Sequence, residues 1–391
     1  MKARKQILFV YRFNYLNEVL PHYRERGRVP TEFLYGLGEI DEDRFEARFV
    51  NSPQGARAGW ARRLGWLIDW PSTFLIRIGC PVEIYPLFRK ELRSADVIFC
   101  VNDPISFSVL LWKRLGFIHG DVHAIVQSAH ERYEKHFRLK LIMKRVVGWL
   151  LRGASVIYVF SNCAKQPVVE YFGVDPLKIH TFPFGMDVNF WKPGNVERQS
   201  FILSIGSDMN RDYDTLIDAL PDDKQLILIT TKEVKIKAKD VIVKRGLSNE
   251  DVRDHYQKAG VVVVPSVSLK YEFAGQSCAL QAAACGASLI VSDSPPMREV
   301  LREGEHCLYY EPENPESLRD KLEYARTHPQ EMWEMGRRAR EHVLRTRTPR
   351  HAAEHLQNVI LSGTTRGSEV EGSRGDWDDA ASSRDSSLRS E

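Results

Sequence analysis

The sequence predicts an α/β protein with two Rossmann-like domains that face a cleft, followed by a disordered C-terminal tail. Short runs of β-branched and large apolar residues alternate with amphipathic stretches, which is typical of buried parallel strands joined by helices. The length of 391 residues exceeds what a single hydrophobic core usually covers. From about residue 362 onward, small polar and charged residues dominate the composition.

Eight apolar runs are the predicted strands, at 7–10, 97–101, 124–126, 156–160, 202–205, 226–229, 261–264 and 289–291. Between them, the spacing of apolar residues predicts helices, including 138–151, 213–220 and 277–285. Ser277 is a suitable N-cap for the last of these helices, and Gly286 is a suitable C-terminal glycine.

A polar stretch near 189–198 marks the boundary between the domains. We expect an N-terminal domain over 1–190, a C-terminal domain over 191–345, a helix over 346–361 that crosses back to the first domain, and a tail over 362–391. Residues 1–190 contain 27 basic and 19 acidic residues, a net charge of +8, and the rest of the chain has a net charge of −5. The tail cannot bury enough apolar surface to offset its chain entropy.

Charge, cysteines and hydropathy exclude several classes of protein. A formal net charge of +3 argues against a dedicated nucleic-acid binder. No apolar stretch reaches the roughly 18 residues that span a bilayer, and the N-terminal run lacks the cleavage site of a signal peptide. The six cysteines form no C-x-x-C pair, which favours reduced thiols. We therefore expect a cytoplasmic protein.

The most informative segment is 261–301, where a buried strand leads through a polar loop into a small-residue helix. The loop carries Lys270, Tyr271 and Glu272, and Gly275 permits a tight turn before the helix. Free N–H groups around Gln276–Cys278 would form an anion site beside the carboxyl ends of the strands. The local pattern alone equally allows an ordinary crossover with a capped helix.

The order and spacing of several motifs resemble those of a known family. Pro265-Ser266, Glu272 and the run from Leu280 to Asp293 resemble the donor-site signature of the retaining glycosyltransferase family 4, the glycosyl transferases group 1, which has the GT-B fold. Phe182–Phe190 resembles that family's P-x-G-[VM]-D-x-x-x-F motif, and 205–217 resembles the opening of its C-terminal domain. The resemblance extends over 156–344 and is weak over the first 120 residues.

The resemblance implies a hexosyltransferase that moves a sugar from a nucleotide-sugar, such as a UDP- or GDP-sugar, to a saccharide or lipid-linked acceptor with retention of configuration. It implies catalytic roles for His130 and Glu272, and it implies a donor site formed by Ser207, Arg211, Gly275, Gln276, Ser277, Cys278, Gln281 and Glu299. Enzymes of this fold generally hold the diphosphate without a metal ion, so no metal and no cofactor is expected. Taken alone, Arg211 could equally be a surface arginine paired with Asp212 or Asp214, and His130 could be a helix-cap histidine.

Three departures from the family pattern keep other functions open. Ser207 replaces the first of two basic residues, Gln281 replaces the second of two glutamates, and 10–15 replaces a Gly-Gly loop. Arg12 or Lys270 would then supply the missing cation, and Arg12 or Asn14 the contact on the acceptor side. A degenerate transferase that acts as a non-catalytic binding subunit, and a nucleotide-sugar epimerase of the same fold, remain alternatives.

Residues 57–70 form a basic, tryptophan-rich stretch that contains Arg57, Trp60, Arg62, Arg63, Trp66 and Trp70. A helix of this kind lies on anionic membrane surfaces, and the net charge of +8 in the first domain agrees with such a role. The alternative is that its tryptophans pack into the core. Peripheral contact with the inner face of the cell membrane is therefore a second hypothesis.

Overall fold

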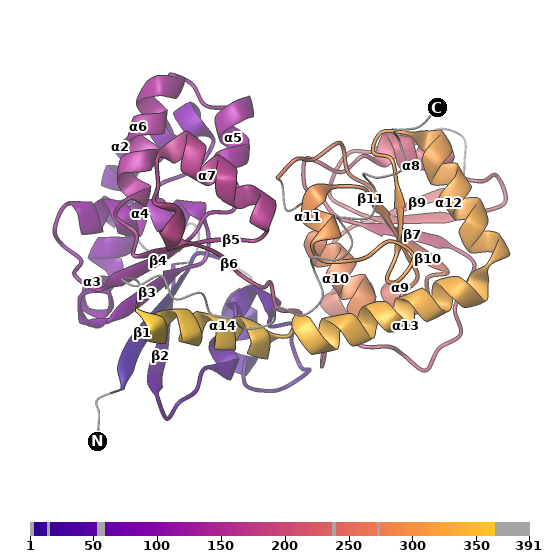
Figure 1. The fold of residues 1–391 in the computed structure, drawn as a ribbon, viewed down its shortest axis with the longest axis horizontal. Coiled ribbons are helices and arrows are strands. Elements are labelled where there is room, and N and C mark those ends of the chain that lie inside the picture. Colours follow the sequence, from indigo (N-terminus) through magenta and orange to yellow (C-terminus); the bar gives the residue numbers. More distant parts are fainter. Residues whose placement is uncertain (1–3, 14–15, 53–58, 237–239, 272–273, 364–391) are drawn as a thin grey trace, which may run out of the picture.

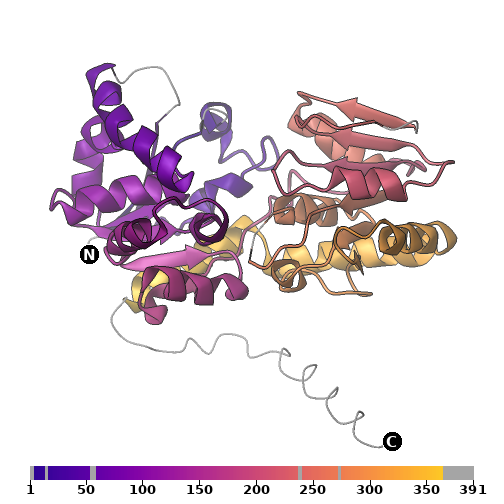
Figure 2. The ribbon, with the colours of Figure 1, turned by 90° about the horizontal axis from the view of Figure 1, so that it is seen from above.

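The computed structural model describes residues 4–13, 16–52, 59–236, 240–271 and 274–363. The chain forms two lobes (Figure 1), which are also seen as separate bodies side by side from above (Figure 2). Each lobe contains one six-stranded parallel sheet with helices packed against it. The predicted α/β fold with two Rossmann-like domains is therefore confirmed. Of the predicted disordered tail over 362–391, Ser362 is the last residue of the C-terminal helix, and residues 364–391 lie outside the described residues.

The sheet of the N-terminal lobe has the strand order β2-β1-β3-β4-β5-β6. Its strands are β1 (Lys5–Tyr11), β2 (Phe45–Asn51), β3 (Val97–Cys100), β4 (Asp121–Ile125), β5 (Val156–Val159) and β6 (Ile179–Thr181). Its helices are α1 (Leu16–Val19), α2 (Gly59–Ile76), α3 (Ile84–Ser94), α4 (Asp103–Arg114), α5 (Ala129–Lys135), α6 (Lys140–Leu151) and α7 (Lys165–Phe172). The inner strands are buried on both faces because helices pack against each of them.

The sheet of the C-terminal lobe has the order β12-β11-β10-β7-β8-β9. Its strands are β7 (Ile202–Ile205), β8 (Leu226–Ile229), β9 (Val241–Lys244), β10 (Val261–Val264), β11 (Leu289–Ser292) and β12 (Leu308–Tyr310). Its helices are α8 (Tyr213–Ala219), α9 (Asn249–Lys258), α10 (Gln276–Ala284), α11 (Pro295–Arg298), α12 (Pro315–Thr327) and α13 (Pro329–Thr346). None of the helices in the described part of the chain is both long and apolar enough to cross a membrane.

The chain crosses between the lobes twice. After β6 it passes into the C-terminal lobe, and α13 leads back to α14 (Pro349–Ser362), which packs on the N-terminal lobe (Figure 1). The two crossings are joined where the Met186 N–H donates to the Arg347 carbonyl at 2.6 Å. On the N-terminal lobe, a Cβ added to Gly36 would lie only 2.7 Å from the Ala353 nitrogen. α14 is thus seated directly on the backbone of that lobe.

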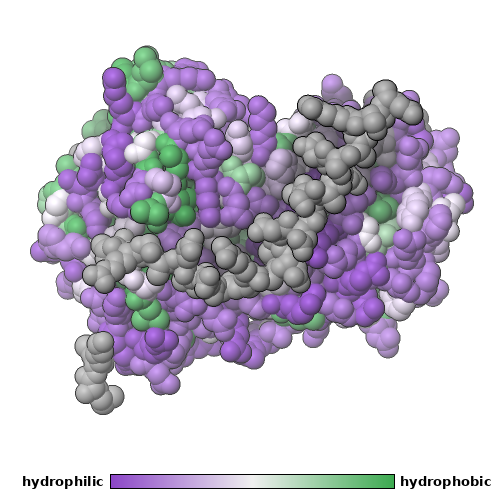
Figure 3. Space-filling view, viewed as in Figure 1, coloured by the Kyte–Doolittle hydropathy of each residue, from purple (hydrophilic) through white to green (hydrophobic). Residues whose placement is uncertain are grey.

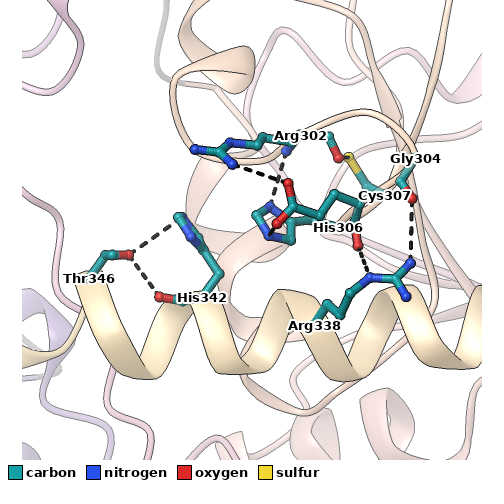
Figure 4. A network of polar contacts seen from close by, with 8 residues as sticks. Arg302, Gly304, His306, Cys307, Arg338, His342 and Thr346 are labelled. Atoms are coloured by element: carbon teal, nitrogen blue, oxygen red, sulfur yellow. Dashed lines mark hydrogen bonds and ion pairs between the residues drawn. The ribbon is translucent and has the colours of Figure 1, made fainter. Parts of the chain in front are cut away.

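A polar network fixes α13 to the loop between α11 and β12 (Figure 4). Arg338 donates to the carbonyl oxygens of Glu305 and Gly304, and the His306 Nδ1 accepts the Arg302 N–H. The His306 ring packs against that of His342 in a tilted arrangement, with centroids 4.5 Å apart. Burial lowers the pKa of His306, and it lowers the pKa of His342 to about 4. Both shifts favour the neutral imidazole, which lets the two rings pack without charge repulsion.

Candidate functional site

The start of α10 is open at the edge of the C-terminal sheet. Gly275 is the N-cap in a left-handed conformation with φ of +82°, and no described side chain caps the helix. Ser277, the predicted N-cap, lies in the first turn instead, because the left-handed turn at Gly275 starts the helix two residues earlier. The predicted C-terminal glycine is confirmed, since Gly286 has φ of +69° just after the helix. The first N–H groups of a helix lack partners within it, so Gln276, Ser277 and Cys278 present donors here.

Arg211 is buried directly beside this helix start. Its Nη2 donates to the Cys278 Sγ at 3.2 Å, and its Nε lies 2.9 Å from the Asp208 carboxylate. Its Nη1 has no hydrogen-bond partner among the described residues. The alternative of a surface arginine paired with Asp212 or Asp214 is wrong, because Arg211 is buried and its ion pair is with Asp208, while Asp212 caps α8 by accepting the Thr215 N–H. A buried guanidinium with an unused donor at an uncapped helix start is a site for an anion.

Two glycines make room for the Arg211 side chain. A Cβ on Gly206 would lie 2.1 Å from the Arg211 Nε, and a Cβ on Gly275 would lie 2.8 Å from its Nη1. Both glycines also have positive φ, +142° and +82°. The loop after β7 and the loop before α10 therefore both pack against one guanidinium, and any larger residue at either place would displace it.

A second cation that the sequence did not indicate lies beside Arg211. Lys232 follows β8, and its Nζ donates to the Arg211 carbonyl at 3.0 Å. Ser207, the predicted donor-binding residue, accepts the Thr231 N–H with its hydroxyl at 2.8 Å and so holds the loop that carries Lys232. The position of Lys232 after a central strand is the signal that could have found it, since the carboxyl ends of parallel strands meet at one edge.

On the opposite lobe, His130 lies in the first turn of α5. It is buried, and its ring centroid is 6.4 Å from that of Tyr271, which comes from the polar loop before α10. The turn that carries His130 is fixed by Asp103, whose carboxylate accepts the N–H groups of Gln127 and Ser128. The structure thus places His130 beside a loop of the C-terminal lobe, and its catalytic role stays a prediction. Glu272, the residue next to Tyr271, lies outside the described residues.

Gln281 and Glu299 are engaged in contacts between the lobes. The Glu299 carboxylate accepts the N–H groups of Asn162 at 2.6 Å and of Cys163 at 2.9 Å, both at the start of the turn Asn162–Ala164. The Gln281 Nε2 donates to the Glu32 carboxylate at 3.1 Å, and its Oε1 accepts from the Tyr256 hydroxyl. Contact of either residue with ribose or phosphate stays a prediction.

Glu32 is a second residue that the sequence did not indicate. Besides Gln281, its Oε1 accepts the indole N–H of Trp191, which lies on the crossing between the lobes, at 2.9 Å. Burial raises the pKa of Glu32 to about 7. One carboxyl group therefore joins the N-terminal lobe, the crossing segment and α10. Nothing in the local sequence around Glu32 distinguishes it from a surface acid.

The remaining predicted residues are spread over the two lobes. The Gln276 side chain is buried and donates to the Pro296 carbonyl at 3.2 Å, which ties α10 to α11. Arg12, at the end of β1, forms an ion pair with Glu83 at 3.3 Å within the N-terminal lobe. Lys270 is exposed on the loop before α10, and Asn14 lies outside the described residues. No group of three or more His, Cys, Asp or Glu side chains in the described part of the chain could hold a metal ion.

Comparisons with known proteins agree with this arrangement. Residues 216–358 match the family model described as "Glycosyl transferase-like". HepE of Anabaena, solved with UDP-glucose, superposes with a TM-score of 0.66 at 13% identity, over 91% of this chain and 99% of that chain. Sucrose-phosphate synthase of Thermosynechococcus elongatus gives 0.68 at 15% identity, over 92% and 99%. TarM of S. aureus gives 0.58 at 14% identity, over 72% and 59%. No curated protein sequence matches the chain.

The fold that extends along nearly the whole chain is GT-B, with two Rossmann-like lobes and a C-terminal helix that returns to the first lobe. The glycosyl transferase-like match covers residues 216–358 only, and the likeness of the whole chain to the solved structures is a likeness of fold, in line with the resemblance seen in the sequence.

Proposed function

We propose that this protein transfers a sugar, with retention of configuration, from a uridine diphosphate sugar to a hydroxyl group of a saccharide or lipid-linked acceptor. The observation that carries the proposal is the buried Arg211 with its unused Nη1 at the uncapped start of α10. A diphosphate has the charge and the acceptor oxygens that this site lacks. UDP is the first choice because the HepE and TarM structures contain it.

In the proposed reaction, the bond between the anomeric carbon and the diphosphate oxygen breaks, and the electron pair leaves with the diphosphate. Arg211, Lys232 and the amides of Gln276–Cys278 stabilise the charge that grows on this leaving group. The acceptor oxygen bonds to the anomeric carbon on the same face, and its proton passes to the departing diphosphate oxygen. Holding both reactants in one closed site lowers the entropic part of the barrier.

In this proposal His130 acts on the sugar or acceptor side of the reaction. It is buried in the lobe opposite Arg211, and its ring faces the loop that leads into α10. An acceptor bound by the N-terminal lobe would therefore lie between His130 and the donor. Glu272, which follows Tyr271 in the same loop, remains our candidate for the residue that faces the transferred sugar.

The test is binding and turnover in an Arg211 series. We expect Arg211→Ala to weaken UDP binding in calorimetry by at least tenfold and to abolish sugar transfer from UDP-glucose, because a charge-assisted contact to a buried anion contributes about 1.5–3 kcal/mol. Arg211→Lys keeps the charge and controls for loss of folding. Arg337→Ala, which removes an exposed arginine paired with Glu341 on α13, should behave as the wild type. Unchanged UDP affinity in folded Arg211→Ala would refute the proposal.

A non-catalytic binding subunit is the second candidate, and one observation favours it. Gln281 and Glu299, two of the predicted donor contacts, are already hydrogen-bonded between the lobes. A protein that binds UDP but releases no UDP from any UDP-sugar, with or without added acceptors, would support this function. Conversion of one free UDP-sugar into another without an acceptor would instead identify an epimerase.

A further inference from the structure

The N-terminal lobe exposes two apolar stripes on neighbouring helices. On α2, Leu67, Trp70 and Phe74 recur at helical spacing, and Ile142, Val146 and Trp149 do so on α6. With Ile68, Leu139 and Leu141, these residues are between 37% and 74% exposed. Scattered exposed apolar residues are normal in a folded protein, but a contiguous group marks an interaction site.

Contacts at Arg138 join the two stripes into one surface. The Arg138 N–H donates to the Leu75 carbonyl of α2 at 2.7 Å, just before α6 begins. Its guanidinium lies 4.1 Å from the centre of the Phe74 ring, which stacks on Trp70 at 5.6 Å. Figure 1 places α2 and α6 together at one end of the lobe, and Figure 3 shows green residues there among purple ones. We call this surface, formed by 67–74 and 138–149, the apolar-basic face.

The charge of this face is predominantly positive, with Asp69 as an acid among the basic residues. Between Glu134 and Glu170 the sequence contains no acidic residue, and it places five basic residues in and beside α6, namely Arg138, Lys140, Lys144, Arg145 and Arg152. On the other side of α6, the Arg114 guanidinium lies 4.8 Å from the centre of the Trp149 ring. On 67–76, the acid Asp69 accepts the Cys80 N–H at 2.7 Å. Cations therefore interleave with exposed tryptophan, leucine and isoleucine side chains.

We propose that the apolar-basic face docks the N-terminal lobe on an anionic lipid surface, with α2 and α6 lying in the plane of the headgroups. Interleaved basic and apolar side chains suit the boundary between headgroups and acyl chains, where both find partners. A second copy of the chain fits less well, because a two-fold interface brings the same patch against itself and would oppose basic residues to basic residues. The side chains of Arg57, Trp60, Arg62, Arg63 and Trp66, on which the sequence hypothesis rested, lie outside the described residues.

The position of this face relative to the cleft gives it a function. α5 carries His130 in its first turn, and Arg138 follows the end of α5 by three residues. A helix of seven residues is about 10 Å long, so the acceptor side of the cleft lies close to the proposed lipid surface. A lipid-linked acceptor would then reach His130 with its lipid still in the bilayer. This last step rests on the proposed function, whereas docking on lipid does not.

The experiment measures flotation of the full chain with vesicles. We expect binding to vesicles of phosphatidylcholine and phosphatidylglycerol in equal parts, weaker binding to phosphatidylcholine alone, and release by salt. Leu141→Glu/Ile142→Glu should lower the partition coefficient at least tenfold, because it places two charges on the most exposed part of the face. Lys140→Gln/Arg145→Gln should lower it about fivefold for each charge removed. Trp333→Glu, on α13 in the other lobe and 47% exposed, is the matched control and should bind like the wild type.

Three outcomes would overturn the proposal. They are no binding to the anionic vesicles, equal binding to both kinds of vesicle, and binding that Leu141→Glu/Ile142→Glu does not change. Sedimentation of the same samples tests whether a second copy of the chain occupies this face. If the wild type is a dimer that does not bind vesicles, and Leu141→Glu/Ile142→Glu dissociates it, the face is an interface between copies. Calorimetry with UDP separates the docking proposal from the proposed sugar transfer. A wild-type protein that binds UDP but does not bind vesicles refutes the docking alone.

Discussion

A substitution at Glu299 can show whether this residue holds the two lobes together or binds the donor, as the sequence resemblance implied. Both carboxylate oxygens accept backbone N–H groups, those of Asn162 and Cys163, from the opposite lobe. We expect Glu299→Gln to weaken this contact, because glutamine keeps one acceptor oxygen, loses the charge and turns an N–H₂ group toward one of the two donors. The side-chain volume is unchanged, so the variant isolates the hydrogen bonds from packing.

The size of the effect follows from the two bonds. A hydrogen bond to a charged group contributes about 1.5–3 kcal/mol when buried, and partial exposure reduces this to about 1 kcal/mol for each bond here. Together they favour contact between the lobes by about 2 kcal/mol, a factor of about 30 in the equilibrium. Glu299→Gln should remove more than half of this, so the closed arrangement should lose about tenfold in population relative to the open one.

Hydrogen exchange measures this directly at the two amides. In the absence of ligand, the segment that contains Asn162 and Cys163 should exchange about tenfold faster in Glu299→Gln, since opening of the lobes releases both N–H groups. Glu313→Gln is the control, because the Glu313 carboxylate accepts the Ser268 N–H at 3.1 Å within one lobe. Unchanged exchange at 162–163, together with weaker UDP binding, would refute the reasoning and make Glu299 a donor contact.

Two further predictions concern a buried histidine, His342, and a glycine, Gly275. Burial holds the pKa of His342 at about 4, against 6.5 in the unfolded chain, so its contribution to stability is present above pH 6.5 and is lost as the pH falls toward 4. Between pH 7.5 and 5 this amounts to about 2 kcal/mol of unfolding free energy; His342→Gln should flatten the pH dependence in urea titrations, and an unaltered slope would contradict this. Gly275→Ala should weaken UDP binding in calorimetry at least tenfold, because its Cβ would lie 2.8 Å from the Arg211 Nη1. Gly304→Ala has the same left-handed strain with open space around its Cβ, and an equal loss of UDP affinity there would show that strain alone is the cause.

The strands show where sequence patterns succeed and fail. All eight strands predicted from apolar runs are inner strands of the two sheets, and the four that were not predicted, β2, β6, β9 and β12, are the four edge strands. An inner strand is covered by helices on both faces and by a neighbour on each side, so nearly every residue is apolar. β9 has no fully buried residue, and β6 and β12 have only three residues each. Their patterns are too mixed or too short to stand out.

The residues of the candidate site also fall into those that the sequence predicted and those that it did not. Arg211 and the start of α10 were predicted because they occur in one stretch of motifs in a fixed order. Lys232 and Glu32 were not predicted, since Lys232 reaches Arg211 across a neighbouring strand and Glu32 reaches Gln281 from the other lobe. The contact of Glu32 leaves no local signal, and that of Lys232 is indicated only by its place after an inner strand, because both contacts depend on which loops the tertiary fold places together.

The sequence by itself determined the two-lobed α/β architecture, the inner strands and the place where α10 begins, at which we propose an anion site. These follow from local chemistry: apolar runs must be buried, and a helix that begins at a glycine leaves its first N–H groups without partners. Only the tertiary structure decided that Arg211 is buried between two glycines, that Glu299 and Gln281 face the other lobe, and that α2 and α6 form one exposed face. Each depends on distances between segments that are remote in the sequence, and packing fixes those distances after the local elements have formed.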